Sequence, residues 1–388
     1  MGVKILLFLW VPLTLWANRN IYPENIKVRI YSAYHFRIFE MRIIDGTYQI
    51  TDGQHKPIRN IGKDDRCRIE IKNNSLSLNI NDRDYDDFKQ LHFKAIDNNS
   101  AFRVIHAINA PSRNYDDNLF ISIFRNGIRL INTVDIDKYV AGVVQAEGGI
   151  MNNNEFFKMQ AVASRTYVLR NFQRHMRYGF NVCDTEHCQV FHGTASKSDI
   201  VQMTEKTKTF VIIDSSLNFI TAPFHANCGG HTVNSEDVWS VPASYMKGVL
   251  DTFCFGGRHA FWEFKISREK FLNYLSENFN FPVNDSLLVE KALSFNQDDG
   301  RKIFFVDLTD IHLKKIRSDL NLKSTFFSIF AYDDMLIFRG RGFGHGVGIC
   351  QEGAMQMINH GFTYDEVIKY YFRDVYVVSY KDLMKLLP

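Results

Sequence analysis

A change of hydrophobic pattern near Asp135 is the feature that most constrains this chain. From about Ile26 to Val134, short apolar runs alternate with Asn, Asp and Gly turns, a pattern typical of β-strands. Asn126-Gly127 lies between two such runs and predicts a hairpin turn. After Asp135 helical spacing appears, and helices and strands are then mixed to the C-terminus. The sequence therefore predicts an α+β protein with a β-rich N-terminal region.

Two helices are predicted directly after this change. The first has Asp137 as its N-cap and ends at the pair Gly148-Gly149. The second runs from about Glu155 to His175 and carries an apolar stripe on one side. Residues 266 to 320 follow as an α/β insertion that contains few motifs.

The glycines near the C-terminus predict a loop. They occur at every second position from 340 to 348, and they match neither a phosphate-binding loop nor a dinucleotide fingerprint. Such a density permits close backbone approach or positive φ, which suits a loop lining a cleft. A helix is expected from Gln351 to Gly361, and Thr363 with Glu366 forms a capping box for a short last helix.

The N-terminus has the layout of a secretory signal peptide. Lys4 precedes an apolar run from Ile5 to Trp16, and Ala17 is followed by polar residues. We therefore expect residues 1–17 to direct export to the periplasm or cell envelope, with a first buried strand as the alternative. The run is too short for a membrane anchor, and no other segment looks transmembrane.

The composition describes an ordinary globular protein. Its formal net charge of +3 is too small to indicate nucleic acid as a partner. Aromatic residues make up 14% of the chain; core packing explains most of them, although sugar-binding grooves also use aromatic faces.

Four segments carry a resemblance to a known family. They are VDIDKYVAGVVQAE (134–147), KMQAVASRTY (158–167), FHANCGGHT (224–232) and GRGFGHGVGICQEGA (340–354). Together, and in this order, they resemble the stage II sporulation protein D / LytB family, whose bacterial members degrade or remodel peptidoglycan. Gly148 and Cys350 depart from the family pattern, which usually has Met or a similar residue and Ser at these positions.

The resemblance implies a domain organisation. Residues 115–388 would form the family's catalytic domain, in which a mixed sheet and helices form a groove. Residues 18–114 would be the β-rich N-terminal region, and 266–320 the insertion.

Glu147 is the candidate catalytic residue. A hydrolase that cuts glycosidic bonds needs two carboxylates, and the motifs mark only one. A lytic transglycosylase can work with one, because the 6-hydroxyl of muramic acid is the nucleophile. One carboxyl then protonates the leaving oxygen and later accepts the hydroxyl proton, a task that favours a raised pKa. The end of a helix would raise that pKa through the helix dipole.

The resemblance also implies a set of substrate-binding residues. Gln160 and Arg165 would bind glycan hydroxyls or carboxylates in a groove, although exposure at the edge of the apolar stripe is the alternative. Tyr167 would stack on a sugar or belong to the core. The remaining candidates are His225, His345 and Gln351.

Cys183, His187 and Cys188 are candidate metal ligands. Tetrahedral zinc needs four ligands, or three with water, and His175, His192 or solvent could supply the fourth. The spacing resembles a stretch that binds zinc in some family members. Such a zinc would be structural, because the sequence contains no hydrolytic zinc motif such as His-Glu-x-x-His, and no cofactor is required for the chemistry. Disulfides, Cys183 with Cys188 or Cys228 with Cys254, are the open alternative in an exported protein.

Three functions remain open at this point. The first is a lytic transglycosylase acting on peptidoglycan glycan strands. The second is a non-enzymatic enhancer that binds peptidoglycan and stimulates a cell-wall amidase, which would then be a partner. The third is a structural envelope protein.

Overall fold

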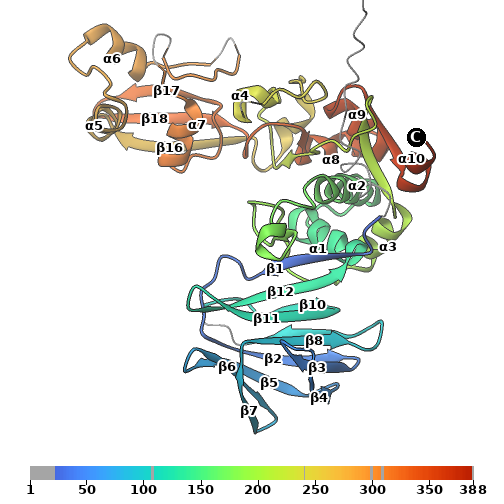
Figure 1. The fold of residues 1–388 in the computed structure, drawn as a ribbon. Helices are drawn as coiled ribbons and strands as arrows, with labels where there is room; N and C mark the ends of the chain where they lie inside the picture. The colour runs from blue at the N-terminus through green and yellow to red at the C-terminus, as the bar shows by residue number, and fades with distance from the viewer. Residues whose placement is uncertain (1–21, 106–108, 240, 298–299, 307–309, 387–388) are drawn as a thin grey trace, which may run out of the picture.

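The computed structural model describes residues 22–105, 109–239, 241–297, 300–306 and 310–386 (Figure 1). The predicted signal peptide, residues 1–17, lies outside the described residues. Strands dominate the N-terminal part and helices and short sheets follow it, so the predicted α+β class with a β-rich N-terminal region is confirmed.

The N-terminal part is built from two packed sheets. One has seven strands in the order β13-β1-β12-β11-β8-β3-β4 and the other has six in the order β10-β9-β2-β5-β6-β7. The first twelve strands are β1 (Asn25–Ile30), β2 (Ile38–Asp45), β3 (Tyr48–Asp52), β4 (Pro57–Ile61), β5 (Arg66–Lys72), β6 (Ser75–Ile80), β7 (Arg83–Phe88), β8 (Gln90–Ala95), β9 (Ala101–Val104), β10 (Arg113–Asp116), β11 (Asn118–Phe124) and β12 (Gly127–Asp135).

Alternating apolar residues form the core between these sheets. In β1, for example, Ile26, Val28 and Ile30 are buried while the residues between them face outward. Faces of β5 and β6 in one sheet contact β12 and β11 in the other. The seven-stranded sheet contains strands from both sides of residue 114, and the division of the chain at that residue stays a prediction.

The hairpin predicted at Asn126-Gly127 is confirmed, with its turn one residue earlier. Phe124 pairs with Gly127, and the loop residues Arg125 and Asn126 have φ of 50° and 61°. Two positive φ values define the tight turn that matches strand twist. Gly127 instead belongs to β12, where a Cβ would lie 2.6 Å from the ring of His35.

Strand β12 leads directly into helix α1 (Ile136–Gly148). Asp135 is its N-cap, because the Asp135 carboxylate accepts hydrogen bonds from the backbone N–H groups of Asp137 and Lys138. The prediction that Asp137 is the N-cap is therefore wrong by two residues. The end predicted at Gly148-Gly149 is confirmed.

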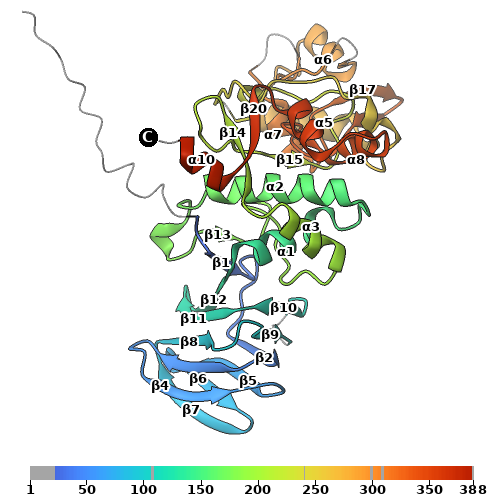
Figure 2. The ribbon, with the colours of Figure 1, turned by 90° about the vertical axis from the view of Figure 1, so that its right-hand side faces the viewer.

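Helix α2 (Asn154–Arg170) lies at the centre of the molecule. Figure 2 shows it crossing between the sheets below and the C-terminal elements above. It packs against α1, against α3 (Ser198–Lys206) and against α8 and α9 of the C-terminal part. It ends at Arg170 rather than at His175, because the chain turns away after Asn171.

Short elements surround α2. They are η2 (Met176–Tyr178), β13 (Val182–Cys183), β14 (Phe210–Asp214), β15 (Phe224–His225), α4 (Ser235–Trp239), η3 (Thr252–Gly256), β19 (Ile349–Cys350), α8 (Gln351–Asn359), α9 (Tyr364–Tyr371), β20 (Val375–Ser379) and α10 (Tyr380–Leu386). The predicted helix start at Gln351 and the capping box of Thr363 with Glu366 are both confirmed.

Residues 261–341 form a separate lobe (Figure 1). Its elements are β16 (Phe261–Ser267), α5 (Arg268–Phe279), α6 (Ser286–Leu293), α7 (Leu313–Asp319), β17 (Phe327–Tyr332) and β18 (Met335–Arg341). The sheet order is β16-β18-β17, and the lobe has its own apolar core around Phe271 and Phe338. The predicted insertion, 266–320, lies within this lobe.

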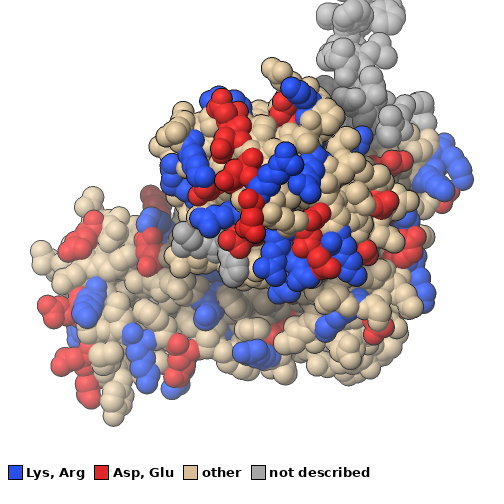
Figure 3. Space-filling view, turned by 90° about the horizontal axis from the view of Figure 1, so that it is seen from below, with Lys and Arg blue, Asp and Glu red and all other residues tan. Residues whose placement is uncertain are grey.

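The surface carries charges of both signs. Figure 3 shows Lys and Arg interspersed with Asp and Glu over the face seen from below, in keeping with the net charge of +3. Across the described ranges, no helix is both long and apolar enough to cross a membrane.

Candidate functional site

Glu147 lies in the last turn of α1, where the helix meets the loop that follows β13. Its side chain is half-buried, and its Oε1 accepts a hydrogen bond of 2.8 Å from the backbone N–H of Val190. No second hydrogen bond to this carboxyl is found among the described residues. The structure therefore holds one carboxyl oxygen in place.

Burial is the main reason that the pKa of Glu147 is raised above its ordinary value. The negative charge of Glu186, an exposed residue of the same loop, raises the pKa further, and the hydrogen bond from Val190 lowers it. The direction agrees with the expectation for an acid/base residue, but burial rather than the helix dipole is the leading cause.

Gln351 connects Glu147 to α2. Its amide nitrogen lies 3.4 Å from the backbone carbonyl oxygen of Glu147 and 3.3 Å from Oε1 of Gln160. Gln160 in turn donates to the hydroxyl of Ser164, 3.4 Å away. Gln160 is fully buried, so it cannot touch a glycan as predicted; it positions Gln351 instead.

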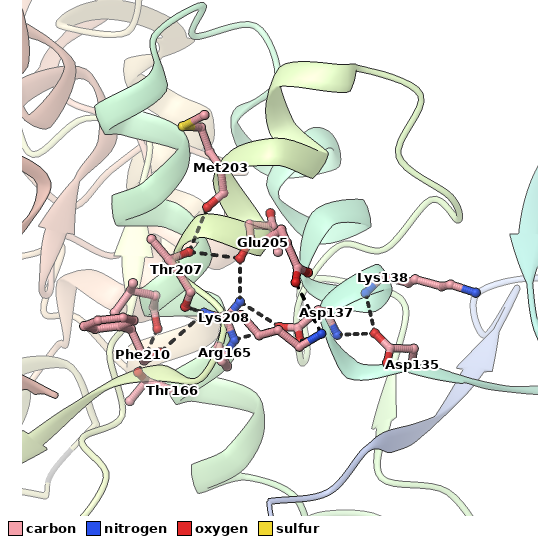
Figure 4. A network of polar contacts seen from close by, with 12 residues as sticks. Asp135, Asp137, Lys138, Arg165, Thr166, Met203, Glu205, Thr207, Lys208 and Phe210 are labelled. Carbon is pink, nitrogen blue, oxygen red and sulfur yellow. Dashed lines mark hydrogen bonds and ion pairs between the residues drawn. The ribbon is translucent and has the colours of Figure 1, made fainter. Parts of the chain in front are cut away.

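Figure 4 shows Arg165 among Asp137, Thr207 and Phe210. Its guanidinium makes an ion pair with Asp137, with Nη2 2.8 Å from Oδ1, and it donates to backbone carbonyls of Thr204, Thr207 and Phe210. Because the side chain is fully buried and its donors are used inside the protein, the predicted glycan contact is wrong. Arg165 joins α1, α2 and the end of α3.

Tyr167 is half-buried beside the Cys/His stretch. Its hydroxyl accepts a hydrogen bond of 3.1 Å from Arg174. Burial raises its pKa to about 12, and the neighbouring Cys183 and Cys188 contribute in the same direction. The residue remains a candidate for contact with substrate.

His225 and His345 lie together, with ring centres 5.2 Å apart. The ring of Trp239, a residue of α4, has its centre 5.2 Å from that of His345. His225 is buried, and its Nε2 has no hydrogen-bond partner among the described residues. Burial lowers the pKa of His345 to about 4. Burial also lowers the pKa of His225 well below its ordinary value, so both rings are neutral near pH 7. His225 pairs across β15 and β19 with Cys350, next to Gln351.

The structure brings together Cys183, His187 and Cys188, as predicted, and adds His175 rather than His192. The two sulfurs are 3.4 Å apart, His187 Nδ1 lies 3.6 and 3.7 Å from them, and His175 Nε2 lies 3.4 Å from Cys188 Sγ. Ligands of tetrahedral zinc at bond lengths of 2.0–2.3 Å are separated by about 3.3–3.8 Å. The four donors therefore fit a zinc ion in type, number and spacing.

Asp184 anchors this loop, and sequence reasoning did not single it out. Its buried carboxylate accepts hydrogen bonds from Tyr31 N, Ser32 N and Ser32 Oγ, at 2.7, 3.0 and 2.6 Å, and pairs with Arg113. Since Asp184 follows Cys183 directly, it ties the candidate metal ligands to the edge of the seven-stranded sheet. The position of Asp184 between candidate metal ligands, in the segment from 183 to 188, is the sequence feature that could have marked it.

All six cysteines are free thiols in the structure. The sulfurs of Cys228 and Cys254 lie 3.5 Å apart, and those of Cys183 and Cys188 lie 3.4 Å apart, well beyond a bond length of about 2.05 Å. Neither disulfide considered for the sequence is present.

The fold and the site define a class: an α+β protein with a half-buried carboxyl of raised pKa at a helix end, beside a Cys/His cluster suited to zinc. A family described as "Stage II sporulation protein" matches residues 124–213, a segment that contains Glu147 and the cluster. This match and the relatives below support the resemblance to the stage II sporulation protein D / LytB family.

Relatives extend this similarity beyond the family segment. An uncharacterized protein of Brachyspira hyodysenteriae is 28% identical over 70% of this chain and 74% of its own length. The stage II sporulation protein D of Bacillus subtilis is 26% identical over 65% of this chain and 77% of its own. The amidase enhancer of Bacillus subtilis is 24% identical over 62% of this chain and 40% of its own.

Proposed function

We propose that this protein is a peptidoglycan lytic transglycosylase that cleaves MurNAc–GlcNAc strands and leaves 1,6-anhydro-MurNAc ends. The observation that carries the proposal is the lone, half-buried Glu147, whose pKa is raised by burial. A carboxyl with a raised pKa keeps its proton to higher pH than an ordinary one, which favours action as a general acid. Similarity to stage II sporulation protein D supports the substrate class.

The reaction needs one carboxyl in two steps. Glu147 gives its proton to the glycosidic oxygen as the bond to C1 of MurNAc breaks. The ionised carboxylate then accepts the proton of the 6-hydroxyl of MurNAc while the oxygen of that hydroxyl bonds to C1. Glu147 is then protonated again, as at the start. Water adds to neither product, so a second carboxylate that activates water is not required.

Zinc is proposed as a structural ion held by His175, Cys183, His187 and Cys188. Four protein ligands complete a tetrahedral shell, so this ion would have no open position for a substrate. It would fix the loop that carries Val190 N, the donor to Glu147, and Glu186. Metal analysis of protein purified without chelator tests this; absence of bound metal in folded protein would overturn it.

Export to the periplasm or cell envelope is part of the proposal, since peptidoglycan lies outside the cytoplasm. The apolar N-terminal run and the similarity to a stage II sporulation protein D and an amidase enhancer support this location. Sequencing the N-terminus of protein recovered from the cell envelope tests it; an intact Met1 would contradict cleavage after Ala17.

Glu147→Gln should abolish the activity. Digestion of purified glycan strands followed by mass spectrometry should show 1,6-anhydro ends with the wild type and none with the variant. Glu277→Gln, which alters an exposed carboxyl on α5, is the matched control and should leave the ends unchanged. Full activity of Glu147→Gln would contradict the assignment of Glu147 as the acid/base residue.

The alternative is a peptidoglycan-binding enhancer of a cell-wall amidase, favoured by the similarity to an amidase enhancer. The two functions separate in one assay, in which the chain is incubated with glycan strands with and without an amidase. Anhydro ends formed by the chain alone support the transglycosylase. Faster peptide release by the amidase, with no anhydro ends, supports the enhancer.

A further inference from the structure

We propose that Cys228, Asp251, Cys254 and Cys350 form a second zinc site, separate from the Cys/His cluster and structural in role. Their ligand atoms all lie within 4.8 Å of one another. The sulfur of Cys228 is 3.5 Å from that of Cys254 and 3.2 Å from Oδ2 of Asp251. Three sulfurs and one carboxylate oxygen are ligands that zinc accepts in a tetrahedral shell.

The spacing favours a single ion over other uses of these thiols. In a tetrahedral zinc shell the edges between sulfur and oxygen ligands are about 3.5 Å, close to the distances of Cys228 to its two neighbours. All four side chains are at most 1% exposed, so the site has no open position for water or substrate. A closed shell of this kind is typical of structural zinc.

Backbone N–H groups already point at the sulfur atoms. Cys350 is the N-cap of α8, and its Sγ accepts from Gly353 N at 3.4 Å and from Cys228 N at 3.3 Å. N–H groups of Gly229 and Gly230 face Cys254. Donors at a helix N-terminus stabilise a thiolate, the form of cysteine that binds metal. These contacts are a second observation that fits metal-bound sulfur.

Asp251 is held in a fixed orientation. Its Oδ1 accepts from Phe253 N at 3.1 Å and its Oδ2 accepts from the hydroxyl of Tyr371 at 2.9 Å. Gly353 leaves the space that this carboxylate needs, because a Cβ there would lie 2.2 Å from Oδ2. Buried groups that orient a ligand in this way are typical of metal sites.

The proposed ion would join three segments that are distant in the sequence. Cys228 follows β15, Asp251 and Cys254 belong to the turn at η3, and Cys350 begins α8. Gln351, the next residue, contacts the backbone of Glu147. The second zinc would thus hold α8 in register with the catalytic carboxyl.

Zinc content of four proteins tests the proposal, measured by inductively coupled plasma mass spectrometry after purification without chelator. We expect two zinc ions per chain in the wild type. Cys350→Ala, which disables the second site, and Cys188→Ala, which disables the Cys/His cluster, should each keep one ion. Cys67→Ala removes a buried thiol in β5 and should keep both ions. If the wild type holds zinc at the second site alone, it has one ion per chain. Cys188→Ala should then also have one ion, and Cys350→Ala none.

Two results would overturn the second site. One is zinc content in folded Cys350→Ala equal to that of the wild type. The other is a peptide map of the wild type, alkylated at harvest, in which Cys228 and Cys254 are joined by a disulfide. If Cys350→Ala fails to fold, zinc X-ray absorption of Cys188→Ala decides: three sulfurs and one oxygen support the site, and any other shell, or no zinc, contradicts it.

Discussion

At the scale of single residues, the charge state of Glu147 depends on three neighbours of different kinds. The protein around it removes water and raises the pKa, and the carboxylate of Glu186 raises it as well. The N–H of Val190 stabilises the ionised form and lowers the pKa. The net direction is upward, so desolvation outweighs the hydrogen bond.

Glu186→Gln should shift the pH dependence of catalysis. A general acid must be protonated, so the rate falls as pH rises through the pKa of Glu147. Removing the neighbouring negative charge lowers that pKa, and the alkaline side of the profile of kcat/KM should move to lower pH. Glu269→Gln, an exposed carboxyl on α5, is the control. A shift to higher pH, or none, would contradict the electrostatic role of Glu186.

Arg165→Met should destabilise the protein, by about 3 kcal/mol, because it leaves the buried carboxylate of Asp137 with only the longer ion pair to Lys208, at 3.8 Å. Urea unfolding measures the loss, and Arg170→Met, on the exposed side of α2, should cost far less. The fraction that stays folded should keep its KM for glycan strands. A raised KM with unchanged stability would instead support the contact between Arg165 and the glycan that the sequence predicted.

The burial of Gln160 and Arg165 on α2 could not be predicted from the sequence. The apolar stripe indicated which side of the helix faces the core, but not that other elements cover its edges. Gln160 is covered by α8 and Arg165 by the segment from 204 to 210. Both coverings join residues far apart along the chain, so no local pattern reveals them.

At the scale of elements, the loop after β13 is pressed against α1. A Cβ on Gly142 would lie 2.3 Å from the carbonyl oxygen of Gly193 and 2.5 Å from the ring of Phe191. The glycine therefore lets the loop approach closely enough for Val190 to reach Glu147.

Gly142→Ala should move this loop and weaken the site. Overpacking of this kind costs about 1–3 kcal/mol, so we expect a lower Tm and a fall in the rate of anhydro-end formation. Gly62→Ala is the matched control, because the nearest atom to its Cβ would be 3.9 Å away. Equal behaviour of the two variants in thermal unfolding and in the activity assay would refute the role given to Gly142.

Local signals were the reliable part of the sequence-based interpretation. The capping box of Thr363 with Glu366 and the helix start at Gln351 depend on residues within one helical turn. The glycines at 342, 344, 346 and 348 all have positive φ, as their density indicated. Asp135 and Asp137 are both acceptable caps two residues apart, and only the end of β12 decides between them.

At the scale of the whole molecule, the lobe of residues 261–341 has a core separate from that of the main body. A unit with its own core can open while the rest stays folded. The Cys/His cluster and Glu147 belong to the main body, so the lobe should be able to lose stability without changing either.

Phe271→Ala, which removes a fully buried ring of the lobe, should cost that lobe about 3–5 kcal/mol. Hydrogen exchange followed by mass spectrometry should show faster exchange in β16, β17 and β18 and unchanged protection in α1 and α2. Phe157→Ala, in the core of the main body, should give the opposite pattern. Uniform loss of protection in Phe271→Ala would show a single cooperative unit.

The hydrogen bond between Gln351 and Glu147 has a consequence for the order in which the protein forms. It joins residues 204 positions apart, and the His225–Cys350 pairing beside it also joins residues that are distant in the sequence. The entropy of closing the intervening loop is lost before contacts between such distant residues stabilise the chain, so these contacts form slowly. A chain emerging from the ribosome or a translocation channel can thus build its sheets and α2 first. The contact between Gln351 and Glu147 forms only after α8 has been made, so the surroundings of this carboxyl are completed late.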